Sequence, residues 1–112
     1  MPRLTLRIDF DDDRHIGHGK IRLLELIGEH GSISRAAKEM NMSYRRAWLL
    51  TDAMNKMFKT PAVETQHGGT GGGAARVTSF GRALVAHYRS MEADAAEAFG
   101  QRLDELDREL RR

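Results

Sequence analysis

Residues 31–57 constrain the fold most, because they place two short helical patterns on either side of a tight turn. The segment reads GSISRAAKEMNMSYRRAWLLTDAMNKM. Ser32 or Ser34 is suited to cap the first helix, and Ser43 is suited to cap the second. Asn41 tolerates the left-handed backbone conformation that a turn between two helices often requires. The pattern predicts a helix-turn-helix.

The second helix of this unit begins with basic, aromatic and hydroxyl side chains, which are groups that contact DNA. We expect Arg45 or Arg46 to reach the edge of a guanine in the major groove. The other arginine would bind phosphate or stack on bases, together with Ser43 and Tyr44. A phosphate could also be held at the amino end of the preceding helix, by Ser32, Ser34 and Arg35. The alternative is an ordinary pair of helices with exposed arginines. Trp48 is expected in the core, since it lies three and four residues beyond Arg45 and Tyr44.

The N-terminal segment, residues 3–10, alternates between polar and apolar side chains. The apolar positions are Leu4, Leu6, Ile8 and Phe10. This alternation predicts a half-buried strand, which must pair with a later segment or with another subunit because a lone strand is unstable. Asp11–Asp13 would form a turn, and a helix is expected over residues 18–29, where glycines follow the apolar stripe.

Residues 62–78 predict a β-hairpin, with strands at 62–67 and 74–78 around the glycine-rich loop 68–73. This loop, GGTGGG, lacks the Lys-Ser/Thr pair of a nucleotide-binding loop. We expect it to form a wing whose backbone approaches DNA, the alternative being a loop without order. The candidate DNA contacts of the wing are His67, Gly69, Thr70, Gly72 and Arg76.

A long helical pattern occupies residues 79–112, with Thr78 or Ser79 as its cap. One apolar stripe follows its whole length after Phe80, with a drift near Gly100 where the helix could bend. Such a helix would span roughly 50 Å, more than a small core can cover, so we expect a homodimer rather than a frayed monomeric tail. The candidate dimer-interface residues are Leu84, Tyr88, Met91, Ala95, Phe99, Leu103, Leu106 and Leu110.

Charge and composition narrow the class of protein. Residues 14–89 are net basic and both ends are net acidic, which is typical of a nucleic-acid binder with a separate partner element. The absence of cysteine favours the reducing cytoplasm, and neither a signal peptide nor a membrane-spanning run is evident. The five histidines lack the spacing of metal ligands, and no catalytic triad or carboxylate pair stands out. We therefore expect no enzyme activity, no cofactor, no metal site and no membrane association.

Three stretches in a fixed order resemble a known family: GSISRAAKEMNMSYRRAW, then MNKM, then VETQHGGTGGGAARVTSFGRALVAHYRSMEADAAEAF. They resemble the N-terminal DNA-binding domain of the bacterial molybdate-responsive regulators of the ModE family over about residues 4–99. More distantly they are similar to the LysR-type winged helix-turn-helix. The T-x-x-G-x-x-L motif of the resemblance is carried by Thr78, Gly81 and Leu84.

The resemblance implies that the third helix reads the major groove, that the wing contacts DNA and that the domain dimerises. It places Ser43, Tyr44, Arg45 and Arg46 in the groove, and residues 68–73 with Arg76 in the wing. ModE continues into a molybdate-binding domain, whereas this sequence ends at Arg112. We therefore expect a stand-alone DNA-binding domain for which molybdate sensing is not inherited.

Together these features predict a mainly α protein with a small β-hairpin wing, comprising a winged helix-turn-helix at 1–78 and a dimerisation helix at 79–112. The expected function is that of a bacterial transcriptional regulator that binds a palindromic operator in double-stranded DNA as a homodimer. A non-enzymatic protein-interaction module and a metal- or oxyanion-responsive regulator are the alternatives. The operator, the regulated genes, activation or repression, the effector and the orientation of the dimer helices stay open.

Overall fold

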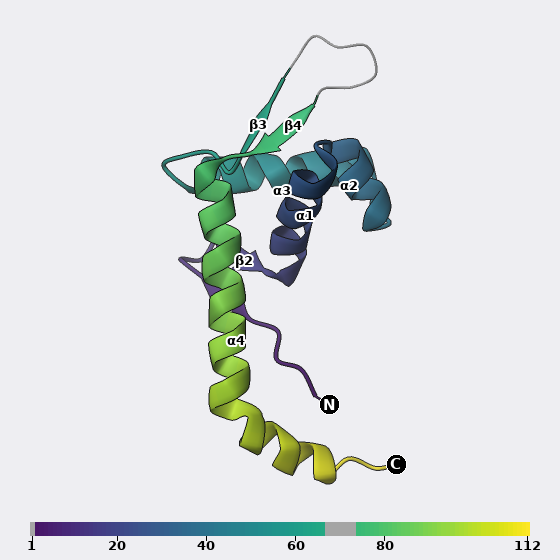
Figure 1. The fold of residues 1–112 in the computed structure, drawn as a ribbon, viewed down its shortest axis with the longest axis vertical. Coiled ribbons are helices and arrows are strands. Elements are labelled where there is room, and N and C mark those ends of the chain that lie inside the picture. The colour runs from purple at the N-terminus through teal and green to yellow at the C-terminus, as the bar shows by residue number, and fades with distance from the viewer. Residues whose placement is uncertain (1, 67–73) are drawn as a thin grey trace.

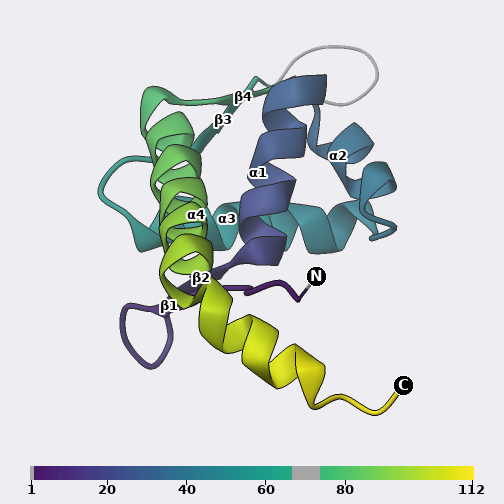
Figure 2. The same ribbon diagram turned by 60° about the horizontal axis from the view of Figure 1, so that its bottom comes forward.

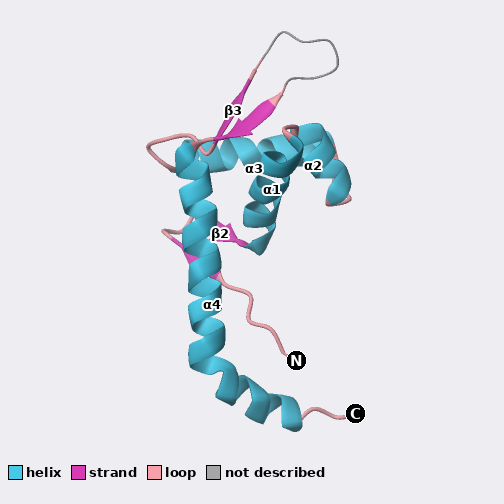
Figure 3. Ribbon diagram, viewed as in Figure 1, coloured by secondary structure: helices cyan, strands magenta, loops and turns pink. Residues whose placement is uncertain are grey.

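The computed structural model describes residues 2–66 and 74–112. Within these residues the chain is mostly helical and carries two small two-stranded antiparallel sheets (Figure 3). The elements in chain order are β1 (Arg7–Asp9), β2 (His15–Gly17), α1 (His18–His30), α2 (Ile33–Glu39), α3 (Tyr44–Met57), β3 (Val63–Thr65), β4 (Ala75–Val77) and α4 (Ser79–Arg108). The elements from β1 to β4 form a head, from which α4 extends (Figure 1).

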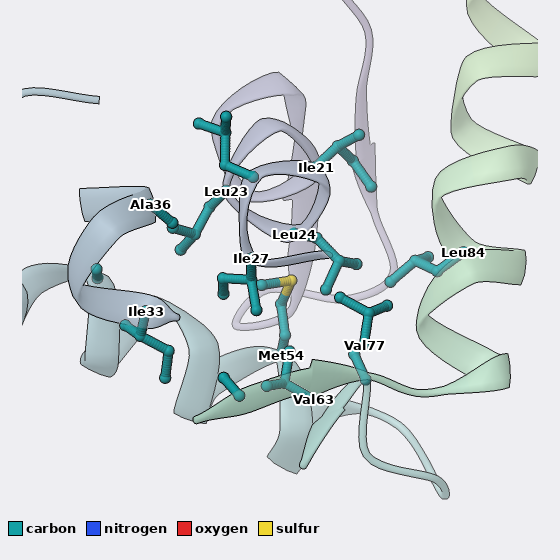
Figure 4. Close-up of a cluster of buried hydrophobic side chains, with 14 of the residues drawn as sticks. Ile21, Leu23, Leu24, Ile27, Ile33, Ala36, Met54, Val63, Val77 and Leu84 are labelled. Atoms are coloured by element: carbon teal, nitrogen blue, oxygen red, sulfur yellow. The ribbon is translucent and has the colours of Figure 1, made fainter. Parts of the chain in front are cut away.

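The core of the head is built around α1, which contacts α2, α3, α4, β2 and β4. Leu24 and Ile27 of α1 are fully buried, and Figure 4 shows them beside Val77 and Met54. Each fully buried leucine or isoleucine side chain contributes about 1.5–3 kcal/mol to stability. Small side chains allow the helices to approach closely at Ala36, Ala37 and Ala47, which are all buried.

Local sequence signals set the starts of α2 and α3 as predicted. The hydroxyl oxygen of Ser32 accepts a hydrogen bond from the Arg35 N–H at 3.2 Å, so Ser32 and not Ser34 is the N-cap of α2. Ser43 caps α3 in the same way, accepting from the Arg46 N–H at 3.1 Å. The turn between these helices contains Asn41 at φ +54°, the left-handed conformation expected there.

The predicted strand over residues 3–10 is wrong in its extent, because only Arg7–Asp9 is a strand. It pairs antiparallel with β2, with Ile8 opposite Ile16, and β2 was not predicted. β2 passes directly into α1 at His18, so residues 3–6 have no strand to pair with. Tyr88 of α4 instead holds this segment, since its hydroxyl donates a hydrogen bond to the Leu6 carbonyl oxygen at 2.6 Å.

The long helix is continuous over 30 residues, and Thr78 is its N-cap. Gly81 lies against the base of the β3–β4 hairpin, where an added methyl group would collide with the Ala62 carbonyl and would lie 2.7 Å from Val77 Cγ1. Beyond the head, α4 continues beside the N-terminal segment and bends in its last third (Figures 1 and 2), in the region where a bend was predicted. The described part of the chain is consequently elongated, with a longest dimension of 55 Å.

Two of the predicted dimer contacts, Leu84 and Tyr88, lie in the chain's own core. Both side chains are buried inside the head, so neither is available to a second subunit. The apolar stripe of α4 therefore has two different environments: its first part completes the chain's own core, and its later part lies beyond the head. Periodicity shows that a helix has an apolar face, but not what covers each turn of that face.

Candidate nucleic-acid interface

The candidate interface is centred on α3, which has one buried face and one solvent-facing side. Ala47, Thr51 and Met54 are buried against the head, and the Thr51 hydroxyl donates to the Ala47 carbonyl oxygen at 2.8 Å. Successive helical residues are turned by about 100°, so Arg45, Leu49 and Lys56 fall on the opposite side. These three side chains are exposed.

The first turn of α3 presents the predicted groove-contacting residues. Tyr44, Arg45 and Arg46 are all exposed, and neither arginine makes a salt bridge within residues 2–66 and 74–112. Ser43 is exposed as well, but its oxygen already caps α3. Two uncompensated guanidinium groups at the start of a helix are suited to bind phosphates or the acceptor atoms of guanine.

The prediction that Trp48 lies in the core is wrong, because 43% of this residue is exposed. Its neighbour Ala47 occupies the buried position instead, where α3 packs on α2. A short side chain fits between two closely packed helices, whereas an indole would force them apart. Trp48 therefore points away from the core, and with Leu49, which is 48% exposed, it adds an apolar pair to the outer side of α3.

The amino end of α2 contributes the second group of predicted contacts. Ser34 and Arg35 are exposed there, while Ser32 is partly buried and caps the helix. Because α2 packs directly on α3, these residues lie on the helix next to the one that carries Arg45 and Arg46. These residues could therefore contact the sugar-phosphate backbone of a DNA duplex that lies across both helices.

The β3–β4 hairpin contributes Arg76, which lies opposite Glu64 in the strand register. Their side chains form an ion pair, with 2.6 Å between Nη2 and Oε2, and both are largely exposed. An exposed pair of this kind is worth at most about 1 kcal/mol, so a phosphate could replace the carboxylate. The other predicted wing contacts, His67, Gly69, Thr70 and Gly72, lie outside the described residues.

A residue that the sequence did not reveal, Asn55, joins α3 to the hairpin. Its side-chain amide donates to the Val63 carbonyl oxygen at 2.9 Å. Its side-chain oxygen accepts from the N–H groups of Ala62 and Val63, at 2.9 and 3.0 Å. These three bonds fix the base of the hairpin relative to the helix. The only signal in the sequence is an amide side chain at the border of the buried face.

The first half of α4 is also held to α1 by charge. Arg89 pairs with Glu25, with 2.7 Å between Nη2 and Oε1, and both side chains are mostly shielded from solvent. Hydrogen bonding from Arg89 is the main reason that the pKa of the Glu25 carboxyl is lowered from its ordinary value. This pair adds a polar contact between α1 and α4 to the apolar packing of the head.

The later part of α4 presents the remaining predicted dimer contacts. Met91, Phe99 and Leu106 are exposed, the last at 68%, while Ala95 and Leu103 are partly exposed. Leu110 is exposed too, but it lies beyond the end of the helix at Arg108. A row of apolar side chains on a helix outside its own core is a typical association surface.

Two further properties of the described residues bear on the class of site. No three His, Asp or Glu side chains among them are grouped so that they could hold a metal ion. No helix in the described part of the chain is long and apolar enough to cross a membrane.

Comparisons with known proteins identify relatives of the chain. No model of a known protein family matches it. It is 44% identical over 85 residues to the molybdenum-pterin-binding protein MopA of Rhodobacter capsulatus, and 38% identical over 104 residues to the molybdenum transport protein ModE of Azotobacter vinelandii. It is 36% identical over 99 residues to the DNA-binding transcriptional dual regulator ModE of Escherichia coli K12. The chain is similar to part of ModE.

The ModE and MopA matches involve most of this chain but a minor part of each relative. They cover 76% of the chain for MopA, 90% for the Azotobacter ModE and 86% for the Escherichia coli ModE. The corresponding shares of the relatives are 32%, 38% and 36%. The chain thus spans about a third of the length of these relatives, whose names describe a molybdenum-pterin-binding protein, a molybdenum transport protein and a DNA-binding transcriptional regulator.

Proposed function

We propose that the chain is a winged helix-turn-helix, with the β3–β4 hairpin as its wing, that binds double-stranded DNA as part of a ModE-type transcriptional regulator. The observation that carries the proposal is the exposed first turn of α3, where Arg45 and Arg46 have no described acidic partner. The name of the Escherichia coli relative, a DNA-binding transcriptional regulator, supports the same function. Such a protein would act on DNA in the bacterial cytoplasm and needs no enzyme activity.

In this proposal each predicted contact has a distinct role. Arg45 and Arg46 read base edges in the major groove, because the first turns of a recognition helix are the part that reaches them. Ser34 and Arg35 of α2 and Arg76 of β4 bind phosphates, which position the protein without reading the sequence. Asn55 holds the wing and the recognition helix in a fixed relation.

The functional unit is proposed to be a homodimer that binds a palindromic site. The exposed stripe of α4 supports this assembly, since Phe99 and Leu106 would be covered by the same stripe of a second copy. Two-fold symmetry in the protein would be matched by two half-sites about one turn of DNA, ~34 Å, or more apart.

The test is selection of binding sites from random duplexes, followed by mobility-shift titrations of the selected site at several salt concentrations. We expect a defined motif whose affinity falls steeply as salt rises, since phosphate contacts release counterions. Arg45→Ala and Arg46→Ala should each reduce discrimination at particular base pairs, by about 1–3 kcal/mol. Arg102→Ala, which removes one exposed positive charge from α4, is the matched control and should keep the discrimination. Binding no tighter than micromolar at low salt would refute the proposal.

The wing contact is tested by a pair of variants at one ion pair. Arg76→Ala should weaken all duplexes alike and reduce the salt dependence, because phosphate contacts do not distinguish sequences. Glu64→Gln should have the opposite effect, since it leaves the Arg76 guanidinium without its carboxylate partner. A loss of preference at a single base pair in Arg76→Ala would contradict this assignment.

A protein-interaction module is the second candidate, favoured by the same apolar stripe of α4. A different protein could cover Phe99 and Leu106 instead of a second copy. This candidate would be supported if the purified chain were monomeric and bound no duplex in the selection experiment. The proposal includes no oxyanion effector, because the chain matches only about a third of the relatives named for molybdenum-pterin binding and molybdenum transport.

A further inference from the structure

Two neighbouring apolar side chains on the outer side of α3, Trp48 and Leu49, are about half exposed. They lie one turn after Arg45, at helical spacings of three and four residues, so all three side chains share one side of the helix. Within the described residues, neither belongs to the core cluster or to the partly buried side chains packed against it. Almost half of each is exposed on the helix that we propose enters the major groove.

The surroundings of this apolar pair are basic and polar. Arg45 and Arg46 precede it, and the next turn carries the ion pair between Asp52 and Lys56, with 2.9 Å between Oδ2 and Nζ. The charges on the same side therefore favour a polyanion as the partner, while Trp48 and Leu49 require an apolar group on that partner. In the major groove of DNA, the apolar group on a base edge is the C5-methyl of thymine.

We propose that Trp48 and Leu49 determine sequence specificity by packing on thymine methyl groups, next to the base pair read by Arg45. This inference rests on the proposed function and adds to it the kind of base that α3 selects. It explains why a large indole is placed on the solvent side of a helix whose buried side takes alanine. The bound sites should accordingly contain thymine one or two base pairs from the arginine contact.

The experiment replaces each thymine of the selected site, one at a time, with deoxyuridine, which lacks only the methyl group. For the wild-type chain we expect the Kd to rise about four-fold at the contacted thymines, the factor that corresponds to one methyl-sized group removed from water. Replacements elsewhere in the site should leave the Kd unchanged.

Variants then assign the contacts to side chains. Leu49→Ala should bind the thymine and deoxyuridine sites equally well at the position that Leu49 contacts, because the methyl group no longer has a partner. Trp48→Ala should lose the deoxyuridine effect at the thymine that Trp48 contacts, which lies at another position of the site. Lys56→Ala, an exposed position on the same side two turns further on, is the control and should keep the full deoxyuridine effect.

The wild-type chain provides a second measurement, since Trp48 is its single tryptophan. Its fluorescence should become protected from a neutral quencher such as acrylamide when the selected duplex is added, in proportion to the bound fraction. A duplex that is bound with unchanged quenching of Trp48 would overturn its part of the proposal without any substitution.

The outcomes separate this inference from the proposed function. If the selected duplex binds but no deoxyuridine replacement changes the Kd, the thymine contacts are refuted and DNA binding stands. If Trp48→Ala and Leu49→Ala lose a protein partner while DNA binding is unchanged, the apolar pair is a protein-docking surface and the inference fails. If no duplex binds, both proposals fail together.

Discussion

Asn55 is the residue whose substitution tests most directly how α3 and the hairpin are joined. In Asn55→Ala the N–H groups of Ala62 and Val63 lose their acceptor and the Val63 carbonyl loses a donor. Ala62 and Val63 are buried, so water does not readily replace the lost amide.

The expected cost follows from these three groups. A buried polar group left without a partner costs about 1–3 kcal/mol, and two such N–H groups dominate here. Alanine is the better helix former by about 0.5 kcal/mol, which offsets part of the loss. The net decrease in the free energy of unfolding should be about 2–3 kcal/mol, corresponding to a decrease of roughly 10 °C in Tm.

Urea unfolding followed by circular dichroism measures this difference. Lys56→Ala is the matched control, because the next residue of α3 is exposed and only forms a surface ion pair; its effect should stay within about 0.5 kcal/mol. Asn55→Asp, which keeps the acceptor and loses the donor, should be intermediate at neutral pH. A loss below about 0.5 kcal/mol for Asn55→Ala would refute the reasoning, because the three bonds would then contribute nothing to the joint.

Three further predictions concern α4 and its contact with α1. Gly81→Ala should destabilise the chain by about 2 kcal/mol or more in urea unfolding, because the methyl group has no space; Gly100→Ala, with open space around it, should stabilise by about 0.5–1 kcal/mol. Phe99→Asp combined with Leu106→Asp should sediment as a monomer, and an unchanged mass would exclude this surface as the dimer interface. The lowered pKa of Glu25 adds stability that is present above its ordinary value of 4.5 and is lost as the pH falls through the folded-state value. In Glu25→Gln, the free energy of unfolding should therefore decrease less than in the wild-type chain when the pH is lowered from 5 into the acid range. The same pH profile in both proteins would contradict this prediction.

The features that depend on neighbouring residues were predictable from the sequence. Ser43 accepts a hydrogen bond from the N–H three residues later, and Asn41 adopts a positive φ. Both features depend on chemistry within one turn of the chain. The positions of the helices and of the hairpin strands followed from the same local signals. The candidate arginines of α3 were found in this way as well.

The features that depend on tertiary packing were not predictable. Whether Trp48 is buried depends on how closely α2 packs on α3. The helical period of the sequence does not give that distance. Tyr88 has the spacing of an exposed stripe, yet its burial depends on the N-terminal segment that its hydroxyl holds. Asn55 has no motif, because its partners are backbone groups of a segment seven and eight residues away.

The uninterrupted passage of α4 out of the core has a geometric consequence for the proposed dimer. Since Tyr88 is buried in the head and α4 is helical from Ser79 to Arg108, the number of residues between Tyr88 and the distal stripe sets the angle of that stripe about the helix axis. One residue inserted between Tyr88 and Met91 would turn the distal stripe by about 100° about the helix axis and displace it by about 1.5 Å. Seven inserted residues would nearly restore the original angle and lengthen the helix by about 10 Å. In the proposed dimer, the residue count of α4 would therefore set the angle between the two proposed DNA-binding surfaces, and binding to operators with altered half-site spacing would measure that angle.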